Sequence, residues 1–486
     1  MNTLHNPWFQ REGLALLTDF YQLIMMAGHW KEERVDRELS FEYFFRYLPP
    51  NTGYAIAAGV EEFLHYFEHL YFTESDLEYL RSLKIFDDCF LEYLRHFEKK
   101  CTIRCVPEGT AVFPFEPVIQ VEGPILEAQL LETALLNIVN YQTLIATKAS
   151  RICLAADGDP VMEFGLRRAH GPDGGLSASR AAFIGGCHST SNVLAGQLYG
   201  IPVAGTHAHS WVMSFSSELE AFRTFARLYP ERCILLVDTY DPVKSGIPNA
   251  IRTFCELREQ GVPIRPAVRL DSGDLAKLSK ICYSMMLQAG LENPLIVASN
   301  DLNEDLIADL KRQGARINAW GVGTQLVTAY DAPALPGVYK AVAMKDTSGK
   351  WSPVIKTSFN YEKATDPGRK YPQRYLNDEG YILGDVMYSE YETPETGGII
   401  EGRSRKHPQV PRRIENAAQS QPLLREAFVL GKRISAERTA AEIREYAAAQ
   451  QSGLTEEFKR LRNPERYPIL LSPAMGDLKH DLLLMH

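Results

Sequence analysis

The chain has 486 residues, of which 45% are hydrophobic and 23% charged, a composition ordinary for a soluble globular protein. Its formal net charge of -9 argues against a general nucleic-acid binder, which needs a basic face, but leaves room for a local basic pocket. The opening MNTLHNPWFQRE lacks the apolar segment of a signal peptide, and no apolar run reaches the about 20 residues of a membrane span. The eight scattered cysteines show no zinc-finger spacing, so we expect free thiols and a cytoplasmic location.

The first 126 residues carry a mixture of helical and extended patterns. Three of these stretches are a helix over 19–31, a strand over 38–45 and helical segments over 59–98. Frequent Pro and Gly after residue 101 are typical of short strands joined by turns. These patterns predict an N-terminal α/β (α+β) domain over residues 1–126, which the segment from about 339 to 400 completes.

Helices alternate with short apolar strands between residues 127 and 338. The six strand candidates are Val161–Phe164, Pro202–Ala204, Cys233–Val237, Ala267–Leu270, Leu295–Ala298 and Ala319–Val322. The helices expected between them include Ser217–Leu228, Pro248–Gln260, Leu275–Ala289 and Asn303–Gln313. Such alternation is typical of βαβ units, so we expect a parallel α/β domain over 127–338.

The patterns change after about residue 340. Residues 390–412 are polar and contain Gly, which is typical of a linker or flexible loop. Residues 435–461 are Ala-rich, charged and mostly helical in pattern. We expect a helical C-terminal extension over 401–486, to which the sequence assigns no role.

Polar or glycine residues follow nearly every strand candidate of the parallel domain. They are Arg167, Thr206, His209, Asp238, Asp241, Arg269, Asp271, Ser299, Asp301, Gly321, Gly323 and Thr324. In a parallel barrel the C-terminal ends of the strands converge on one face, and that face carries the chemistry. One such residue would mean little, but six consecutive strands with polar ends indicate a common site.

Two of these strand ends suggest a site for an anion and a metal ion. The Gly321–Thr324 segment could close backbone N–H groups and a hydroxyl on a phosphate, although a plain tight turn has the same pattern. Arg269 and Asp271 point to one face of a strand, where Asp271 could hold Mg²⁺ and Arg269 could meet a carboxylate or phosphate. Asp274 is expected only to cap the next helix.

The remaining candidates are each open to more than one interpretation. Asp238 can position Mg²⁺–pyrophosphate or only form a helix-cap turn, and Arg167 can meet an anionic ligand or lie on the surface. His209 can attack a phosphoryl group. With His207 it can also form a zinc pair, for which no third ligand stands out, or be a buried hydrogen-bonding residue. Tyr21 can stack on an aromatic ligand or fill the core.

Taken together, these motifs resemble those of nicotinate phosphoribosyltransferases, in the type II phosphoribosyltransferase group. The resemblance covers roughly residues 10–380, and the combination of motifs is highly specific. The matching segments, in the family's order, are LLTDFYQLIM (16–25), KASRI (148–152), EFGLRRAHGPDGGLSASRAA (163–182), VAGTHAHSWVMSF (203–215), VDTYD (237–241), VRLDSGDL (268–275), SND (299–301) and GVGT (321–324).

The resemblance implies a fold and a reaction. The implied fold is an irregular, incomplete α/β barrel over 127–338 with the N-terminal α/β domain packed beside it. Members transfer the phosphoribosyl group of phosphoribosyl pyrophosphate to the ring nitrogen of nicotinate, giving nicotinate mononucleotide and pyrophosphate in NAD salvage. Mg²⁺ is the implied cofactor, ATP hydrolysis is coupled to the transfer, and similar enzymes are homodimers.

The resemblance also implies a role for each site residue. His209 matches the transiently phosphorylated histidine, although His207 beside it replaces a residue that is usually apolar. Asp238 and Asp271 match acidic residues of the active site and are candidate ligands of pyrophosphate-bound Mg²⁺. Residues that match nicotinate contacts are Tyr21, Thr206 and Arg269, and the segment around Tyr21 is implied to reach the partner's barrel. Residues that match donor-binding positions are Arg167, Asp301, Gly321, Gly323 and Thr324.

Four other functions would each need residues that differ from those in this sequence. Nicotinamide phosphoribosyltransferase would need an acceptor such as Asp where Thr206 stands, because an amide lacks the charge of a carboxylate. Quinolinate phosphoribosyltransferase would need more cations for a dicarboxylate. A barrel isomerase or aldolase acting on another sugar phosphate would need a catalytic Lys or Glu at a strand end, and Lys244 comes nearest. A non-catalytic relative would have lost some of the strand-end residues.

Overall fold

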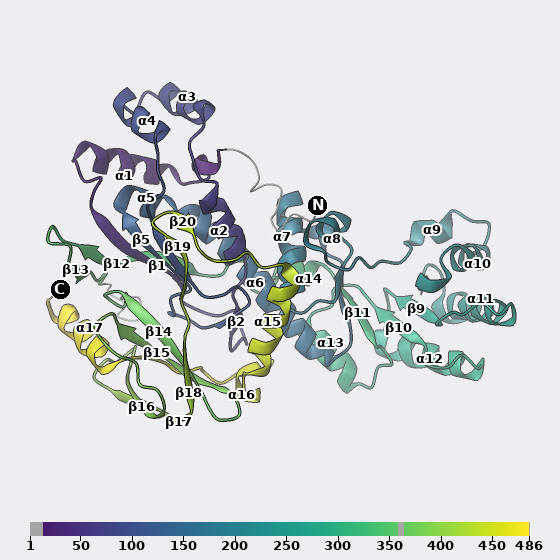
Figure 1. Cartoon of the computed structure of the whole chain (residues 1–486). Helices are drawn as coiled ribbons and strands as arrows, with labels where there is room; N and C mark the ends of the chain where they lie inside the picture. The colour runs from purple at the N-terminus through teal and green to yellow at the C-terminus, as the bar shows by residue number, and fades with distance from the viewer. Residues whose placement is uncertain (1–12, 358–363, 486) are drawn as a thin grey trace. The chain divides into compact units, whose positions relative to one another are not determined.

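The structure is a computed structural model that describes residues 13–357 and 364–485, so the polar opening segment considered above lies outside the described residues. The chain divides into two compact units: Lys148–Pro333 forms most of one, and Thr3–Thr147 with Ala334–His486 forms the other. The long helix α6 (Glu132–Ala156) contributes residues to both (Figure 1). None of the described helices is both long and apolar enough to cross a membrane.

The unit Lys148–Pro333 is built on a six-stranded sheet in the order β7-β6-β11-β10-β9-β8, in which every neighbouring pair is parallel. Its strands are β6 (Val161–Glu163), β7 (Ser189–Thr190), β8 (Leu235–Leu236), β9 (Ala267–Leu270), β10 (Leu295–Ala298) and β11 (Ala319–Val322). The strands follow chain order around the sheet, and the last strand pairs with the first. Among the described residues, the one neighbouring pair without a ladder is β7 and β8.

The strand predictions are confirmed for the central strands and wrong at the edge. β9, β10 and β11 begin and end at the expected residues, and β6 and β8 are shorter than expected. The segment Pro202–Ala204 is not a strand, because only Val203 forms an isolated parallel bridge, with Thr190. Pro202 has no N–H to donate, so a ladder cannot extend through it.

Side-chain caps mark the starts of several helices of this unit. Ser217, Asp274 and Asn303 each accept a hydrogen bond from a backbone N–H three residues further on, and these bonds fix the starts of three helices. The longer helices are α7 (Gly171–Ile184), α10 (Glu218–Leu228), α11 (Ile247–Glu259), α12 (Leu275–Gln288) and α13 (Glu304–Arg312); the shorter ones are α8 (Val193–Tyr199), α9 (His209–Met213), α14 (Thr324–Val327) and the 3₁₀ turn η3 (Leu166–Arg168). The four predicted helices therefore agree with the structure to within one residue at each end.

One face of the parallel sheet packs into an apolar cluster. Met162, Val297 and Ala319, from three adjacent strands, form its buried centre, and Phe164 and Ile234 pack against them. Buried apolar side chains on a parallel sheet contribute about 1.5–3 kcal/mol each. This packing fixes the strands relative to one another, and so fixes the positions of the residues that follow them.

The other unit contains two larger sheets. Their orders are β13-β12-β1-β5-β3-β19-β20 and β17-β16-β21-β15-β14-β18, and a further pair is β2-β4. The strands are β1 (Glu38–Phe45), β2 (Ala55–Ile56), β3 (Thr102–Cys105), β4 (Ala111–Val112), β5 (Ile119–Pro124), β12 (Gly337–Lys345), β13 (Trp351–Pro353), β14 (Lys370–Leu376), β15 (Ile382–Ser389), β16 (Gly398–Ser404), β17 (Pro411–Ala417), β18 (Gln419–Pro422), β19 (Arg425–Val429), β20 (Lys432–Arg433) and β21 (Ile469–Leu471). The helices are α1 (Phe20–Lys31), α2 (Val60–Glu68), α3 (Glu74–Ser82), α4 (Asp88–Arg95), α5 (Ile125–Leu130), α15 (Ala440–Ser452), α16 (Glu456–Lys459) and α17 (Pro473–Met485).

The expectation of a helical extension over 401–486 is wrong in part. Helices α15, α16 and α17 are present, but strands lie between and before them, and β16 and β17 form a hairpin across the expected linker. β19 pairs antiparallel with β3, more than three hundred residues earlier in the chain. Pairing over such a separation leaves no local signal, and many side chains of β17 and β18 are exposed, so the apolar alternation of a strand is weak.

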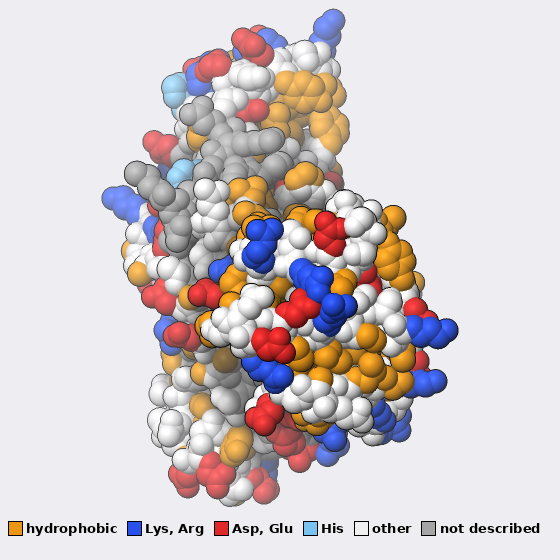
Figure 2. Space-filling model, turned by 90° about the vertical axis from the view of Figure 1, so that its right-hand side faces the viewer, with side chains coloured by type: hydrophobic (Ala, Val, Ile, Leu, Met, Phe, Trp, Pro, Cys, Tyr) orange, Lys and Arg blue, Asp and Glu red, His pale blue; other side chains and the backbone are white. Residues whose placement is uncertain are grey.

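Charged side chains of both signs are mixed on the face of the molecule that Figure 2 shows. Blue Lys and Arg side chains lie next to red Asp and Glu side chains there, with apolar patches between them. A nucleic-acid-binding face instead gathers its cations into one patch or stripe. The described part of this face has no such stripe.

Candidate active site

The carboxyl ends of β8, β9 and β10 carry one hydrogen-bonded group of polar residues. The backbone N–H of Asp271 and the hydroxyl of Ser272 each donate to Oδ2 of Asp238 over 2.7 Å. The hydroxyl of Ser299 donates to Oδ1 of Asp271. Because the three strands are neighbours in a parallel sheet, the residues that follow them share one edge. The structure therefore brings Asp238 and Asp271 together.

Two buried polar atoms at this edge have no hydrogen-bond partner within residues 13–357 and 364–485. They are Oδ1 of Asp238, a residue that keeps 8% of its surface exposed, and Nε of Arg269. An unsatisfied buried polar group costs roughly 1–3 kcal/mol, and more when it is charged. A ligand that offers a cation or donor to Asp238 and an acceptor to Arg269 would satisfy both atoms.

Arg269 and Thr206 form a pair suited to an anionic group. Nη1 of Arg269 donates to the hydroxyl oxygen of Thr206. Burial lowers the pKa of Arg269, Asp271 and Asp238 raise it, and the charge of Arg167 lowers it again. A guanidinium remains charged in proteins despite such effects. The site therefore offers a largely buried fixed cation beside a hydroxyl, which is the complement of a carboxylate.

His209 lies at the first position of α9, between two strand ends. Its Nδ1 is 3.1 Å from the hydroxyl oxygen of Thr239, and its Nε2 is 3.8 Å from Oδ2 of Asp271. The imidazole keeps 42% of its side-chain surface exposed. A histidine that is oriented on one nitrogen and accessible at the other has the geometry of a nucleophile or of a proton carrier.

His207 has a different environment, although it is only two residues away. Its ring packs on Phe222 and Phe225, and its Nε2 accepts a hydrogen bond from the backbone N–H of Leu236 over 3.2 Å. Burial lowers the pKa of His207 to about 4. This buried ring accepts the backbone N–H of a residue of β8, a strand at the edge of the sheet. His207 is thus a structural residue.

The segment Gly321–Thr324 spans the end of β11, with Gly321 inside the strand and Gly323 after it, and it lies at the same edge. A Cβ on Gly321 would lie 2.6 Å from the ring of Phe164 and 3.4 Å from Cβ of Ser299. Only a glycine at this position therefore lets β11 lie this close to Phe164, which follows β6. Gly323 precedes α14, which begins at Thr324, and both residues are half-buried. Through Ser299, the segment is adjacent to Asp271.

Arg167 and Asp301 lie at this edge without partners of their own. Arg167 is exposed on η3 after β6 and forms no ion pair among the described residues, yet its charge reaches Arg269. Asp301 is exposed after β10 and forms no described hydrogen bond. Asn300 and Asp301 have φ of 86° and 40°, a left-handed conformation that non-glycine residues rarely adopt. Such strain is often retained at functional sites.

Tyr21 is not placed with the other site residues, because it belongs to the other unit. It lies on α1, 48% exposed, and its hydroxyl donates to Glu132 over 3.3 Å. Burial raises its pKa, as does the charge of Glu132. Phe20, Ile24 and Met25 are exposed on the same helix.

Of three hydroxyl residues that organise the site, Ser299 was selected from the sequence as a strand-end residue, and Thr239 and Ser272 were not. Thr239 orients His209, Ser272 donates to Asp238, and Ser299 donates to Asp271. All three lie inside the motifs VDTYD, VRLDSGDL and SND. A hydroxyl directly beside a strand-end acid is the signal that could have identified them.

The chain is similar to known proteins along nearly its whole length. The model of the nicotinate phosphoribosyltransferase N-terminal domain matches residues 16–140, and that of the C-terminal domain matches residues 369–479. The Bacillus subtilis protein named nicotinate phosphoribosyltransferase is 43% identical over 465 residues, which cover 96% of this chain and 94% of that protein. The chain belongs to the nicotinate phosphoribosyltransferase family. The resemblance read from the motifs is therefore confirmed.

Two human comparisons extend the family assignment to a eukaryotic sequence and to a solved structure. The human protein named nicotinate phosphoribosyltransferase is 36% identical over 538 residues, which cover 98% of each chain. The crystal structure of human nicotinic acid phosphoribosyltransferase aligns with a TM-score of 0.82 and 34% identity, over 96% of this chain and 99% of that one. This nicotinate phosphoribosyltransferase family member therefore shares the mixed α/β fold over nearly its full length.

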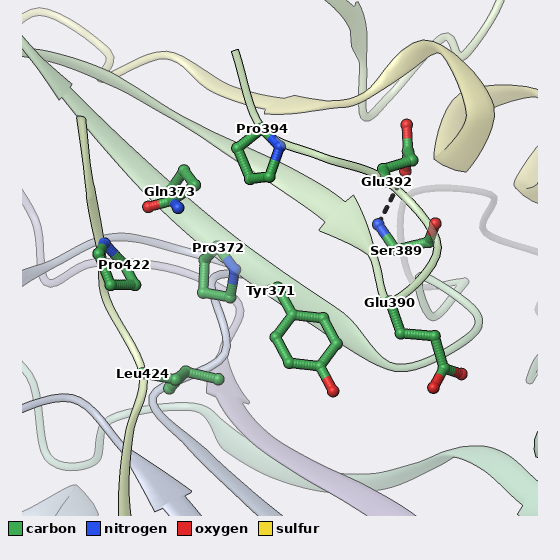
Figure 3. Close-up of a pocket in the computed structure, with 9 residues that line it drawn as sticks. All are labelled: Tyr371, Pro372, Gln373, Ser389, Glu390, Glu392, Pro394, Pro422 and Leu424. Carbon is green, nitrogen blue, oxygen red and sulfur yellow. Dashed lines mark hydrogen bonds between the residues drawn. The ribbon is translucent and has the colours of Figure 1, made fainter. Parts of the chain in front are cut away.

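The pocket in Figure 3 belongs to the other unit, and none of the strand-end residues is among those that line it. It has a volume of about 280 Å³, with prolines and Leu424 on one side and Glu390 and Glu392 on the other. Both carboxylates already have partners: Glu390 pairs with Arg369, and Glu392 accepts from the N–H of Ser389 and the hydroxyl of Ser472. The cavity therefore offers no unsatisfied charge to a ligand, and we do not assign the chemistry to it.

Proposed function

We propose that the protein transfers the phosphoribosyl group of phosphoribosyl pyrophosphate to the ring nitrogen of nicotinate, giving nicotinate mononucleotide and pyrophosphate for NAD synthesis by salvage. Family membership supports this reaction. The observation that carries it to this chain is the group at one sheet edge: the Arg269–Thr206 pair beside Asp238 and Asp271. The pair complements an anionic ring, and the two acids lie where positive charge would develop.

The reaction needs positioning and charge stabilisation more than covalent help from the protein. The bond between the anomeric carbon and the pyrophosphate oxygen breaks, and the oxygen keeps the electron pair. The ring nitrogen of nicotinate donates its lone pair to the same carbon. Arg269 and Thr206 would hold the nicotinate carboxylate, so that the ring nitrogen points at the carbon. Asp238 and Asp271 would stabilise the positive charge of the ribosyl group as the pyrophosphate leaves.

The donor would be held by the neighbouring strand ends. The glycine turn Gly321–Thr324 offers backbone N–H groups and a hydroxyl to the 5-phosphate. Arg167, which has no carboxylate partner among the described residues, would meet the pyrophosphate, with Asp301 at the same edge. These assignments extend the family's motif to the residues of this chain.

Mg²⁺ is the metal ion that this donor set fits. Oδ1 of Asp238 is buried without a partner among the described residues, and Asp271 is adjacent, so two carboxylates can contribute hard oxygen ligands. Mg²⁺ prefers one or two carboxylates together with water and substrate phosphate oxygens. When bound, the ion would neutralise charge on the pyrophosphate leaving group.

His209 would couple ATP hydrolysis to the transfer. Its Nε2, the nitrogen not held by Thr239, would attack the γ-phosphorus of ATP, so that the bond to the β-phosphate oxygen breaks and ADP leaves. Water would later hydrolyse the phosphohistidine and release phosphate. The support for His209 over His207 is environmental: one ring is exposed at the edge, and the other is buried and hydrogen-bonded.

Nicotinate is favoured over nicotinamide because of one position. The residue after Gly205 is Thr206, whose hydroxyl is paired with Arg269, so both side chains would contact the same anionic group. An enzyme for the amide would instead need an acidic acceptor here, to pair with the amide N–H. A carboxylate substrate meets charge-assisted hydrogen bonds here. An amide would leave the Arg269 guanidinium without a carboxylate hydrogen-bonded to it.

The proposal includes the assembly and the fold of the catalytic unit. The cyclic strand order with one gap, between β7 and β8, supports an incomplete α/β barrel. A cytoplasmic homodimer, in which Tyr21 contacts nicotinate in the partner's barrel, would cover the exposed apolar residues Phe20, Ile24 and Met25 of α1.

The test is direct conversion by purified protein. Nicotinate and phosphoribosyl pyrophosphate are incubated with Mg²⁺, and nicotinate mononucleotide and pyrophosphate are quantified with and without ATP. We expect stoichiometric products, a higher rate with ATP and loss of activity with a chelator. Absence of nicotinate mononucleotide under all these conditions would refute the proposal.

A further inference from the structure

A second cluster of ligand-type side chains lies in the other unit, at the C-terminal end of α2. It comprises His65, Glu68 and His69, whose ligand atoms all lie within 4.8 Å of one another. Residues at i, i+3 and i+4 share one face of a helix, so this spacing places two imidazoles and a carboxylate side by side. The two rings have centroids 4.2 Å apart. Nothing in the phosphoribosyl transfer requires these residues.

The orientation of His69 is that of a metal ligand. Its Nδ1 lies 2.9 Å from the carbonyl oxygen of His65, and because a carbonyl can only accept, Nδ1 carries the hydrogen. In the neutral ring, Nε2 then presents its lone pair outward. Histidines that bind metals commonly donate their other ring N–H to a backbone carbonyl or carboxylate in this way. His69 is exposed, so an ion can approach from its side.

His65 is half-buried, with its ring next to that of His69. Burial, together with the charges of His69 and Arg433 and against the opposite effect of Glu68, lowers the pKa of His65 to about 4.

Glu68 is held in place by a cation that has other partners. Arg433, on β20, lies 3.2 Å from Glu68, 2.8 Å from Glu61 and 3.3 Å from Glu437. Arg433 would therefore remain paired with Glu61 and Glu437 if the Glu68 carboxylate rotated to bind a metal ion. Lys99 donates to the carbonyl oxygen of Glu68, so the surroundings hold two cations and three carboxylates. The carbonyl end of a helix also favours a positive charge.

We propose that His65, Glu68 and His69 bind one divalent transition-metal ion, of the class of Zn²⁺ and Co²⁺, at the C-terminal end of α2. Two imidazoles and one carboxylate suit such ions, whereas Mg²⁺ prefers oxygen ligands alone. Three protein ligands leave a coordination position to water. The ion would hold the three side chains at the end of α2 together, and the Glu68–Arg433 ion pair would connect them to β20. This site is independent of the reaction proposed above.

The test uses the full-length protein, stripped with a chelator, and Co²⁺ as the probe. Co²⁺ is added while its visible absorption is followed, and then Zn²⁺ or excess Mg²⁺ is added to displace it. We expect one equivalent of Co²⁺ to bind through these residues, with displacement by Zn²⁺ and not by Mg²⁺. A His69→Ala variant, altered at an exposed residue, should bind at least about tenfold more weakly.

A matched control is His96→Ala. His96 is also an exposed histidine at a helix end, with Glu92 four residues before it, but it lacks a second histidine. This variant should bind Co²⁺ like the wild type, and Zn²⁺ should raise the melting temperature of both proteins but not of His69→Ala. Equal Co²⁺ affinity in the wild type and in His69→Ala would overturn the proposal, since the ion would then bind elsewhere.

Discussion

Nε2 of His209 lies 3.8 Å from Oδ2 of Asp271, while Oδ1 of the same carboxylate accepts a hydrogen bond from Ser299. Asp271 therefore connects the exposed histidine to the next strand end, and its backbone N–H connects it to Asp238. A change at any of these residues should affect the chemistry more than the fold, because the apolar cluster beneath the edge is separate from them.

Replacing His209 with alanine should separate the two activities of the enzyme. His209→Ala removes the proposed phosphate acceptor but none of the residues that hold nicotinate or the donor. We expect the ATP stimulation to disappear while some ATP-independent synthesis of nicotinate mononucleotide remains. Parallel assays with and without ATP, and acid-labile labelling by γ-labelled ATP, measure this. If both activities vanish in a folded variant, the phosphohistidine role is not supported.

The control for that experiment is His207→Gln. His207 is buried against Phe225 and accepts from Leu236, so its loss should affect stability and not phosphorylation. We expect labelling from ATP to persist in this variant. Labelling that requires His207 instead would reverse the assignment of the two histidines.

Replacing Arg269 with lysine should weaken nicotinate binding. Lysine keeps the charge but loses the planar fork that reaches both Thr206 and the proposed carboxylate. We expect KM for nicotinate to rise about tenfold to a hundredfold, with a smaller effect on KM for phosphoribosyl pyrophosphate. Initial rates with each substrate varied in turn decide this. Equal effects on the two KM values would place Arg269 elsewhere in the reaction.

Replacing Gly321 with alanine should destabilise the catalytic unit. The new Cβ would lie 2.6 Å from the Phe164 ring, and overpacking of this kind costs about 1–3 kcal/mol. Gly28→Ala on α1 is the matched control, because nothing lies within 4 Å of its Cβ. Alanine inside a helix should stabilise by about 0.5–1 kcal/mol. Thermal unfolding of both variants measures the contrast, and similar melting temperatures would contradict the close approach of β11 to β6.

His207 should make the stability of the catalytic unit depend on pH. Its pKa is lowered to about 4 in the folded protein, from an ordinary value of about 6.5, chiefly by burial. Between these values the unfolded chain binds a proton that the folded chain does not. The stabilisation is therefore complete above about pH 6.5 and is lost as the pH falls toward 4, by on the order of 1–3 kcal/mol.

The His207→Gln variant isolates this contribution. Denaturant unfolding of both proteins at several pH values, followed by tryptophan fluorescence, reports on the region because Trp211 packs on Phe225 beside His207. We expect the pH slope to flatten in the variant. An unchanged slope would mean that other groups account for the acid sensitivity.

The sequence predicted the central strands well because their signal is local. β9, β10 and β11 are short apolar runs, and Asp271, Ser299 and Gly323 follow them directly, so each strand is marked by residues next to one another in the chain. The edge segment at Pro202–Ala204 and the strands after residue 398 depend on partners elsewhere in the chain, such as β3 for β19. Apolar periodicity does not reveal such partners.

The candidate site was predictable as a set of strand ends, but not in its hydrogen bonding. Thr206, His209, Asp238, Arg269 and Asp271 lie together in the structure because parallel strands end at one edge. Which of two histidines is accessible depends on burial, which spacing does not reveal. The hydroxyls of Thr239 and Ser272 act only through His209 and Asp238, which the sequence had already selected.

Substrate selectivity tests the central claim most directly: that Arg269 and Thr206 bind an anionic ring. Purified protein is assayed with nicotinate and with nicotinamide at the same phosphoribosyl pyrophosphate concentration, and kcat/KM is compared. The buried cation predicts a strong preference for nicotinate, which Thr206→Asp should reduce by giving Arg269 a carboxylate of its own. A preference for nicotinamide in the unaltered protein would contradict the account.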